Sequence, residues 1–357
     1  MPWLSKSLPG NIKMNGPDRT SGHPAAKPNA AIRWLTRLLI FLAWLTTFAL
    51  GTIAVLRIFH HDGEQVLIWI NAFTRYVYLP AYLCLLVAAW KRRRWLALAN
   101  LLIISCHLYW LAPDFLYARR VESPSTSDVT DRNAVHSLRI YFANARLSNL
   151  EHDAWLHEIK EANPDIVVLV EFPWPWQETF ARSPLITAYQ YGASFYPASD
   201  QAIFSKLPIT SITQDWIARR CVVTAEIPLG SQTLRLVGLH APRPMDFHDN
   251  DYDGYWRRVL PLLAGERHPV VVVGDFNATQ YSRVYEQIKA DGLRSAHEDR
   301  GRGYATSWPN GQEWLPPIRI DQAFLSSDVE CSSISEGKGV GSDHKPFILD
   351  VEIRDPS

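Results

Sequence analysis

The sequence has few cysteines and no net charge, and its first 30 residues contain no apolar stretch. Cysteine occurs four times in 357 residues, which gives little reason to expect disulfide bonds. Cys221 and Cys331 could pair in an oxidising compartment, but we interpret them as unpaired core residues. Because a signal peptide would begin its apolar region sooner, we expect residues 1–32 to be a disordered tail, and Met14 is an alternative start.

Although the net charge is zero, basic and acidic residues are unevenly distributed along the chain. Residues 1–138 carry 15 Lys and Arg against 7 Asp and Glu, whereas residues 139–357 carry 21 against 29. This difference suggests that the two parts of the chain lie in different environments. Duplex DNA binding needs many Lys and Arg contacts to phosphate, so the acidic second part is poorly equipped for it.

Long apolar runs are present, and all lie within residues 33–117. They cover about residues 38–56, 66–90 and 95–112, and the first and third contain no charged residue. Runs of this length predict transmembrane helices, with buried helices of a soluble protein as the alternative. Arg75 within the second run is costly in a membrane, so we expect it near the outer boundary.

Basic residues predict the orientation of these three helices. Lys27, Arg33 and Arg37 precede the first run, and residues 91–94 (KRRR) separate the second from the third. The positive-inside rule then places the N-terminus in the cytoplasm and everything after residue 112 outside the inner membrane. Residues 118–137 are polar and are predicted to be a linker, followed by a separate domain over residues 138–357.

From Leu138 onward, short apolar runs alternate with helical patterns, which predicts an α/β domain with mixed or antiparallel sheets. Polar side chains follow or precede these runs where the strands should end. They are Asn144, Glu171, His240, Asp275, Asn277, Asp321, Asp343 and His344. Rigid strand ends hold reacting groups in fixed positions, so this set is a candidate active site.

Three segments carry a resemblance to a known family. NPDIVVLVEF, VVVGDFNAT and GSDHKPFILDVEI, with RIDQAFLS between the last two, match in order and spacing. Over residues 138–354 the chain resembles the endonuclease/exonuclease/phosphatase superfamily, the deoxyribonuclease-I-like phosphodiesterases and phosphatases. This resemblance implies a four-layer sandwich of two packed mixed β-sheets flanked by helices, with the active site at one end of the sheets.

The resemblance also implies a metal site. Glu171 matches the metal-binding Glu of the family, with Asn144 and Asp343 nearby. Mg²⁺ prefers oxygen ligands and keeps several waters, so one or two carboxylates suffice, and Mn²⁺ is an alternative. Asn144 could instead satisfy a turn.

The remaining roles concern the phosphate. Asp275 resembles the base that activates water, and Asn277 would position the nucleophile or the phosphate. His240 and His344 match histidines that contact the phosphate and stabilise its developing charge. Asp321 matches the carboxylate that orients the second histidine, although a structural salt bridge is an alternative, and His240 could be a loop or core histidine.

The substrate stays open among three hypotheses. The membrane helices favour a phosphohydrolase acting on a lipid-linked or other extracytoplasmic phosphoester, and the arrangement is similar to bacterial membrane proteins of this family. The second hypothesis is an extracytoplasmic nuclease acting on DNA or RNA. The third is a non-catalytic binding protein that retains the fold. The sequence does not indicate an oligomeric state.

Overall fold

The computed structural model describes residues 30–116, 135–196, 199–244, 251–263, 269–311 and 314–355. Its first part is helical. The helices are α1 (Ala30–His60), α2 (Gln65–Ala72), α3 (Thr74–Val77), α4 (Leu79–Trp90) and α5 (Arg94–Leu116). Among the described residues, α1 and α5 are each long and apolar enough to cross a membrane.

The middle apolar run is bent, whereas the sequence predicted one span over residues 66–90. Helix α2 and the segment Thr74–Trp90 meet at 72°, so they form either one broken span or a re-entrant loop. The Arg57 guanidinium donates to Asn71 Oδ1 (3.4 Å) and to Thr74 Oγ1, both at the bend. Pro80 lies in the first turn of α4, where its missing N–H costs no helical hydrogen bond.

Helices α1, α4 and α5 pack through small and branched side chains. Ala54 of α1, Ala81 of α4 and Ile103 of α5 belong to one buried apolar cluster. Large apolar side chains on the same helices remain exposed, including Phe48 at 75% and Leu102 at 67%. An exposed apolar surface of this kind is unfavourable in water and is compatible with lipid.

Arg75 has a partner within this part of the chain. Its guanidinium lies 3.0 Å from Asp114 Oδ2 of α5, and Asp114 is buried. It also donates to the carbonyl oxygen of Tyr304 at 3.0 Å. The charge that argued against the middle run as a span is therefore paired.

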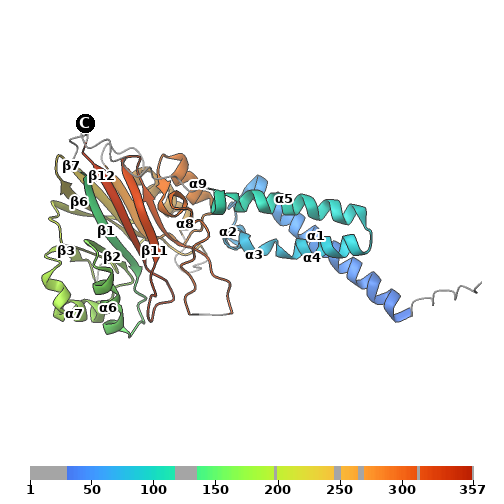
Figure 1. Cartoon of the computed structure of the whole chain (residues 1–357), viewed down its shortest axis with the longest axis horizontal. Helices are drawn as coiled ribbons and strands as arrows, with labels where there is room; N and C mark the ends of the chain where they lie inside the picture. Colours follow the sequence, from blue (N-terminus) through green and yellow to red (C-terminus); the bar gives the residue numbers. More distant parts are fainter. Residues whose placement is uncertain are drawn as a thin grey trace, which may run out of the picture. The chain divides into compact units, whose positions relative to one another are not determined.

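The second part of the chain forms two six-stranded sheets with helices on both outer faces (Figure 1). The first sheet has the order β11-β12-β1-β2-β4-β3, and the second has the order β5-β6-β7-β8-β10-β9. The strands are β1 (Val135–Asn144), β2 (Ile166–Val170), β3 (Tyr191–Ser194), β4 (Ala202–Ser205), β5 (Ser211–Ile217), β6 (Arg220–Leu229), β7 (Gln232–His240), β8 (Val270–Asp275), β9 (Arg294–Ser295), β10 (Asp321–Leu325), β11 (Val329–Glu336) and β12 (Phe347–Arg354). The helices are α6 (His152–Ala162), α7 (Trp174–Arg182), α8 (Tyr252–Leu263), α9 (Arg283–Ala290) and α10 (Ala296–Asp299), with a 3₁₀ turn at Pro184–Thr187.

Strand β8 shows why the sequence produces four layers. Val271 and Val273 belong to the core between the two sheets, whereas Val270 and Val272 belong to the core beneath α8 and α9. Because successive side chains point to opposite faces, a strand buried on both faces has a continuous apolar run. On the first sheet, Tyr141 and Val167 pack in the same way against Trp155 of α6.

The predicted fold class is confirmed as an α/β domain of two packed mixed sheets flanked by helices. Strand β1 begins at Val135, slightly before the predicted boundary at residue 138. Residues 1–29 and 117–134, which contain most of the predicted tail and linker, lie outside the described residues. Cys221 and Cys331 are both free and buried in the core between the sheets, as the interpretation of core residues expected.

Truncation of Trp155, which packs α6 against the first sheet, should lower the stability of the domain. Trp155 is 1% exposed and contacts Trp176 with ring centroids 4.5 Å apart, so Trp155→Ala should cost about 3–5 kcal/mol. Trp174→Ala is the matched control because Trp174 is 59% exposed. Urea unfolding followed by circular dichroism should show a large drop in midpoint for the first variant only. Equal midpoints for the two variants would contradict the packing of α6 on the sheet.

Candidate active site

The first sheet contributes Asn144 and Glu171 from adjacent parallel strands. Asn144 is the last residue of β1 and pairs with Val170, the last residue of β2, so Glu171 follows at the same edge. Asn144 Nδ2 donates to Glu171 Oε1 at 3.1 Å, and the Leu147 amide donates to Glu171 Oε2 at 3.2 Å. Glu171 has a φ of +51°, a left-handed conformation that is strained for a residue other than glycine.

The second sheet places three further residues in one row across its strands. Asp275 at the end of β8 pairs with His240 at the end of β7 and with Asp321 at the start of β10. Gly274 allows the two parallel strands to approach here, because an added Cβ would lie 2.4 Å from the Leu239 carbonyl oxygen. The register of β7, β8 and β10 therefore gathers residues from three distant parts of the sequence.

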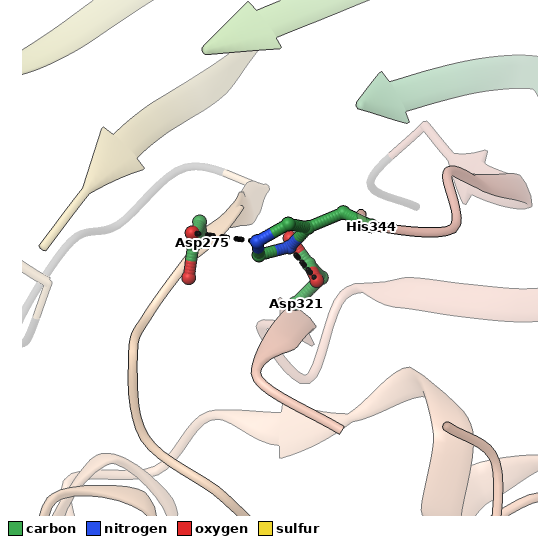
Figure 2. Close-up of side chains that lie close together, drawn as sticks. All are labelled: Asp275, Asp321 and His344. Atoms are coloured by element: carbon green, nitrogen blue, oxygen red, sulfur yellow. Dashed lines mark hydrogen bonds and ion pairs between the residues drawn. The ribbon is translucent and has the colours of Figure 1, made fainter. Parts of the chain in front are cut away.

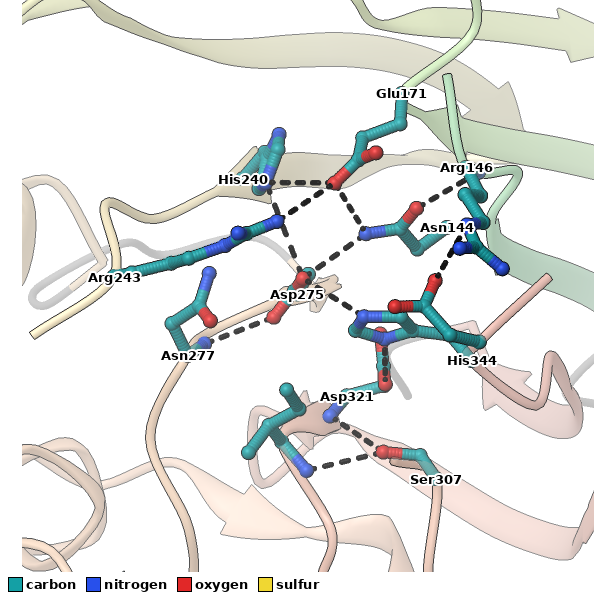
Figure 3. Close-up of polar contacts among 12 residues, drawn as sticks. Asn144, Arg146, Glu171, His240, Arg243, Asp275, Asn277, Ser307, Asp321 and His344 are labelled. Atoms are coloured by element: carbon teal, nitrogen blue, oxygen red, sulfur yellow. Dashed lines mark hydrogen bonds and ion pairs between the residues drawn. The ribbon is translucent and has the colours of Figure 1, made fainter. Parts of the chain in front are cut away.

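The side-chain amide of Asn144 bridges the two sheets. Asn144 Nδ2 donates to Asp275 Oδ2 at 3.1 Å as well as to Glu171, and Figure 3 shows it between the two carboxylates. All three side chains are buried. The polar ends of both sheets thus meet at one place, as the sequence analysis predicted.

His344 is held by Asp321 and faces Asp275. Its Nδ1 forms a 2.8 Å hydrogen bond with Asp321 Oδ2, and its Nε2 lies 3.9 Å from Asp275 Oδ2 (Figure 2). Burial opposes protonation, but the negative charges of Asp321 and Asp275 outweigh it and raise the pKa of His344 to about 9. The protonated ring is a hydrogen-bond donor at neutral pH.

His240 has a similar arrangement, which the sequence analysis did not predict in full. Its Nδ1 forms a 3.0 Å hydrogen bond with Asp200 Oδ2, and its Nε2 lies 3.8 Å from Glu171 Oε1. Although burial lowers it, the hydrogen bond and charge of Asp200 raise the pKa of His240. Asp200 lies in the loop before β4, and only its acidic character next to a predicted strand could have indicated it.

Asp275 is the central carboxylate of the cluster. Burial and the charge of Asp321 raise its pKa, and the two histidines oppose this shift. The Asn277 amide N–H donates to Asp275 Oδ1 at 2.9 Å, and Asn277 has a φ of +47°, which asparagine tolerates. A buried carboxylate with a raised pKa, oriented by a backbone N–H, is suited to accept a proton.

Arg243 and Arg146 are two site residues that the sequence analysis missed. Arg243 Nη2 lies 3.8 Å from Glu171 Oε1, and Arg146 Nε lies 3.6 Å from Asp343 Oδ1. Arg243 and Asp343 line one cavity together with Asn277 and His344. The HAPR sequence that begins with the last residue of β7 carries the only signal for Arg243, a basic residue shortly after a candidate histidine.

The carboxylates fit a divalent cation. The buried Glu171 has its cationic neighbours, His240 and Arg243, at 3.8 Å, beyond hydrogen-bond distance. Within the described residues, Asp321 Oδ1 is buried and accepts no hydrogen bond. Such oxygen atoms are the ligands that Mg²⁺ and Mn²⁺ prefer. The sequence predicted Glu171 as a metal ligand, with Asn144 and Asp343 nearby. A second group, Asp275, Asp321 and His344, has possible ligand atoms within 4.8 Å of one another.

The carboxylates gathered at the strand ends can bind a divalent cation, and the histidines can donate hydrogen bonds to a phosphate. The family model of the Endonuclease/Exonuclease/phosphatase family matches residues 137–344. The match covers more than half of the chain, so the chain belongs to this family, whose members are hydrolases that act on phosphoester bonds. No curated protein matches the chain.

Solved structures share the fold. A humanised D. rerio TDP2 with 14 mutations is 16% identical with a TM-score of 0.51, covering 60% of this chain and 98% of its own. The endonuclease/exonuclease/phosphatase from Bacteroides vulgatus is 19% identical with a TM-score of 0.51, covering 61% and 99%. A D. rerio TDP2 solved with a single-strand DNA product is 16% identical with a TM-score of 0.50, covering 60% and 98%. These identities establish likeness of fold.

Metal binding should depend on Glu171. Glu171→Gln keeps the shape of the side chain and removes its charge, so Mn²⁺ affinity should fall about tenfold or more. Glu178→Gln is the matched control, because Glu178 pairs with Arg182 on the surface of α7. Electron paramagnetic resonance titration of free Mn²⁺ measures both affinities. An unchanged affinity in Glu171→Gln would remove this residue from the metal site.

Proposed function

We propose that the chain is a membrane-anchored, divalent-metal-dependent phosphohydrolase. It cleaves a phosphodiester or pyrophosphate bond by in-line attack of water, and its substrate is a lipid-linked or other extracytoplasmic phosphoester. The convergence of two histidine–carboxylate pairs on Asp275, beside Asn144 and Glu171, carries the proposal.

Glu171, with Asn144 and Asp343, would hold Mg²⁺ or Mn²⁺, which would neutralise charge on the phosphoryl oxygens. Asp275 accepts the proton of the attacking water, consistent with its burial and raised pKa. Asn277, whose Nδ2 donates to the Ala241 carbonyl oxygen at 2.9 Å, positions the water or the phosphate.

His344 and His240 donate hydrogen bonds to the phosphate oxygens from Nε2, because Nδ1 of each ring is engaged by a carboxylate. Asp321 and Asp200 fix the two rings and favour their protonated forms. Arg243 adds a third positive group at the cavity. Donors that are oriented before the reaction stabilise the charge of the transition state without reorganisation.

The membrane location is part of the same proposal. The apolar helices α1 and α5 support an anchor, and the basic residues before the first apolar run and at residues 91–94 support a cytoplasmic N-terminus. With the bent segment Gln65–Trp90 as a third crossing, the domain would lie on the extracytoplasmic side of the inner membrane. The deficit of basic residues in residues 139–357 favours a lipid or small phosphoester over duplex nucleic acid.

A substrate panel tests the proposal. The full chain in detergent, with Mg²⁺ or EDTA, is given a chromogenic phosphodiester, duplex and single-stranded DNA, sphingomyelin and a polyprenyl pyrophosphate. We expect Mg²⁺-dependent turnover of a lipid or small phosphoester. Asp275→Asn should lower kcat/KM about 10²- to 10⁴-fold, the usual contribution of a general base. Asp215→Asn, on the exposed face of β5, is the control.

Each other outcome has a defined meaning. Turnover of nucleic acid alone would show that the protein is a nuclease and would reject a lipid substrate. An inert wild-type chain across the panel would favour a non-catalytic binding protein. Full activity in Asp275→Asn would show that another group acts as the base.

A further inference from the structure

A cavity of about 200 Å³ adjoins the candidate catalytic residues, and part of its wall comes from helix α2. Its polar lining includes Arg243, Asn277, Asp343 and His344. Its apolar lining includes Ile68, Trp69 and Ala72 of α2 and Ala278, Ile318 and Ile320. For comparison, a dry cavity of about 150 Å³ is large enough to hold benzene.

Contacts on both sides of α2 hold this wall against the rest of the cavity. Before α2, Asp62 Oδ2 accepts a hydrogen bond of 2.6 Å from the Arg283 amide. After α2, the Tyr76 hydroxyl donates to the Pro317 carbonyl oxygen at 2.7 Å. Ile68 is 6% exposed and belongs to the same apolar cluster as Ala278. Helix α2 is therefore a packed part of the cavity wall.

The chemistry of the apolar wall favours an apolar occupant over a strongly polar one. The hydroxyl groups that line the cavity are Thr279 and Ser282. Both already serve local structure, since Ser282 Oγ accepts from the Tyr285 amide and Thr279 Oγ1 from the Tyr281 amide. A nucleobase or sugar would lose hydrogen bonds to water there, whereas a hydrocarbon chain would gain burial.

We propose that this cavity binds the hydrocarbon chain next to the phosphate of the substrate, with Ala72 and Trp69 determining chain specificity. The inference rests on the proposed phosphohydrolase function and identifies the substrate class as a lipid phosphoester. The phosphate lies at His344 and Arg243, and the first carbons of the chain lie against α2. Helix α2 also belongs to the apolar helical part of the chain, which presents exposed apolar side chains.

Binding of alkyl phosphates tests the inference without requiring turnover. Calorimetry with the full chain in detergent and Mg²⁺ compares inorganic, ethyl and hexyl phosphate. Wild-type protein should bind hexyl phosphate at least about tenfold more tightly than ethyl phosphate, since each buried methylene adds affinity. Ala72→Phe, which fills the cavity, should reduce this preference to about twofold or less. Ala89→Phe, at an exposed position of α4, should keep it.

The outcomes separate the two proposals. Equal affinity for ethyl and hexyl phosphate in the wild type would overturn the inference, whatever the substrate panel shows. A hexyl preference that persists in Ala72→Phe would overturn it as well, because the chain would then bind elsewhere or in the micelle. If Ala72→Phe no longer binds inorganic phosphate, Trp69→Ala replaces it as the test variant. Trp69→Ala should also reduce the preference for hexyl over ethyl phosphate. A hexyl preference without turnover in the panel would reject only the hydrolase proposal.

Discussion

The hydrogen bonds of one buried amide connect the two halves of the site. Asn144 Nδ2 contacts Glu171 of the first sheet and Asp275 of the second, so two sheets that pack through apolar side chains elsewhere meet here through polar groups. A buried polar group that loses its partners costs free energy, which makes the alignment of the two sheet ends part of the stability of the domain. The positions of Glu171 and Asp275 are then coupled through Asn144.

The same geometry places several ionisable side chains close together where they are buried from solvent. Asp275, Asp321 and Glu171 are buried near His240 and His344, and the pKa values of His344 and Asp275 are both raised, for different reasons. The carboxylates raise the pKa of His344 to about 9, whereas burial and Asp321 raise the pKa of Asp275. One group is thereby prepared to donate hydrogen bonds and the other to accept a proton. Each histidine has its own carboxylate at Nδ1, so Asp275 is not needed to orient either ring.

Much of this arrangement could be predicted from the sequence because strands end abruptly. The continuous valines before Asp275 indicate a strand buried on both faces, and each polar residue after such a run must lie at a sheet edge. Strand pairing was harder to predict, because nothing local shows that β10 lies antiparallel beside β8. Asp200 and Arg243 were missed for the same reason, since both act from loops whose positions depend on the finished fold. The bend after α2 also depends on a distant residue, Arg57.

That bend places α2 of the helical part of the chain at the cavity. Arg57, Arg75 and Asp114 are charged groups in apolar helices, where each alone would be costly. They are satisfied by the folded domain, since Arg57 donates to the Tyr281 carbonyl oxygen, Arg75 to that of Tyr304, and Asp114 accepts from the Tyr281 hydroxyl. Apolar contacts alone would tolerate sliding of α2, whereas directed hydrogen bonds require one position. Because these buried charges would cost free energy without their partners, the contacts hold the helices, and with them α2, at the cavity. The domain without its helices would lack one wall of that cavity.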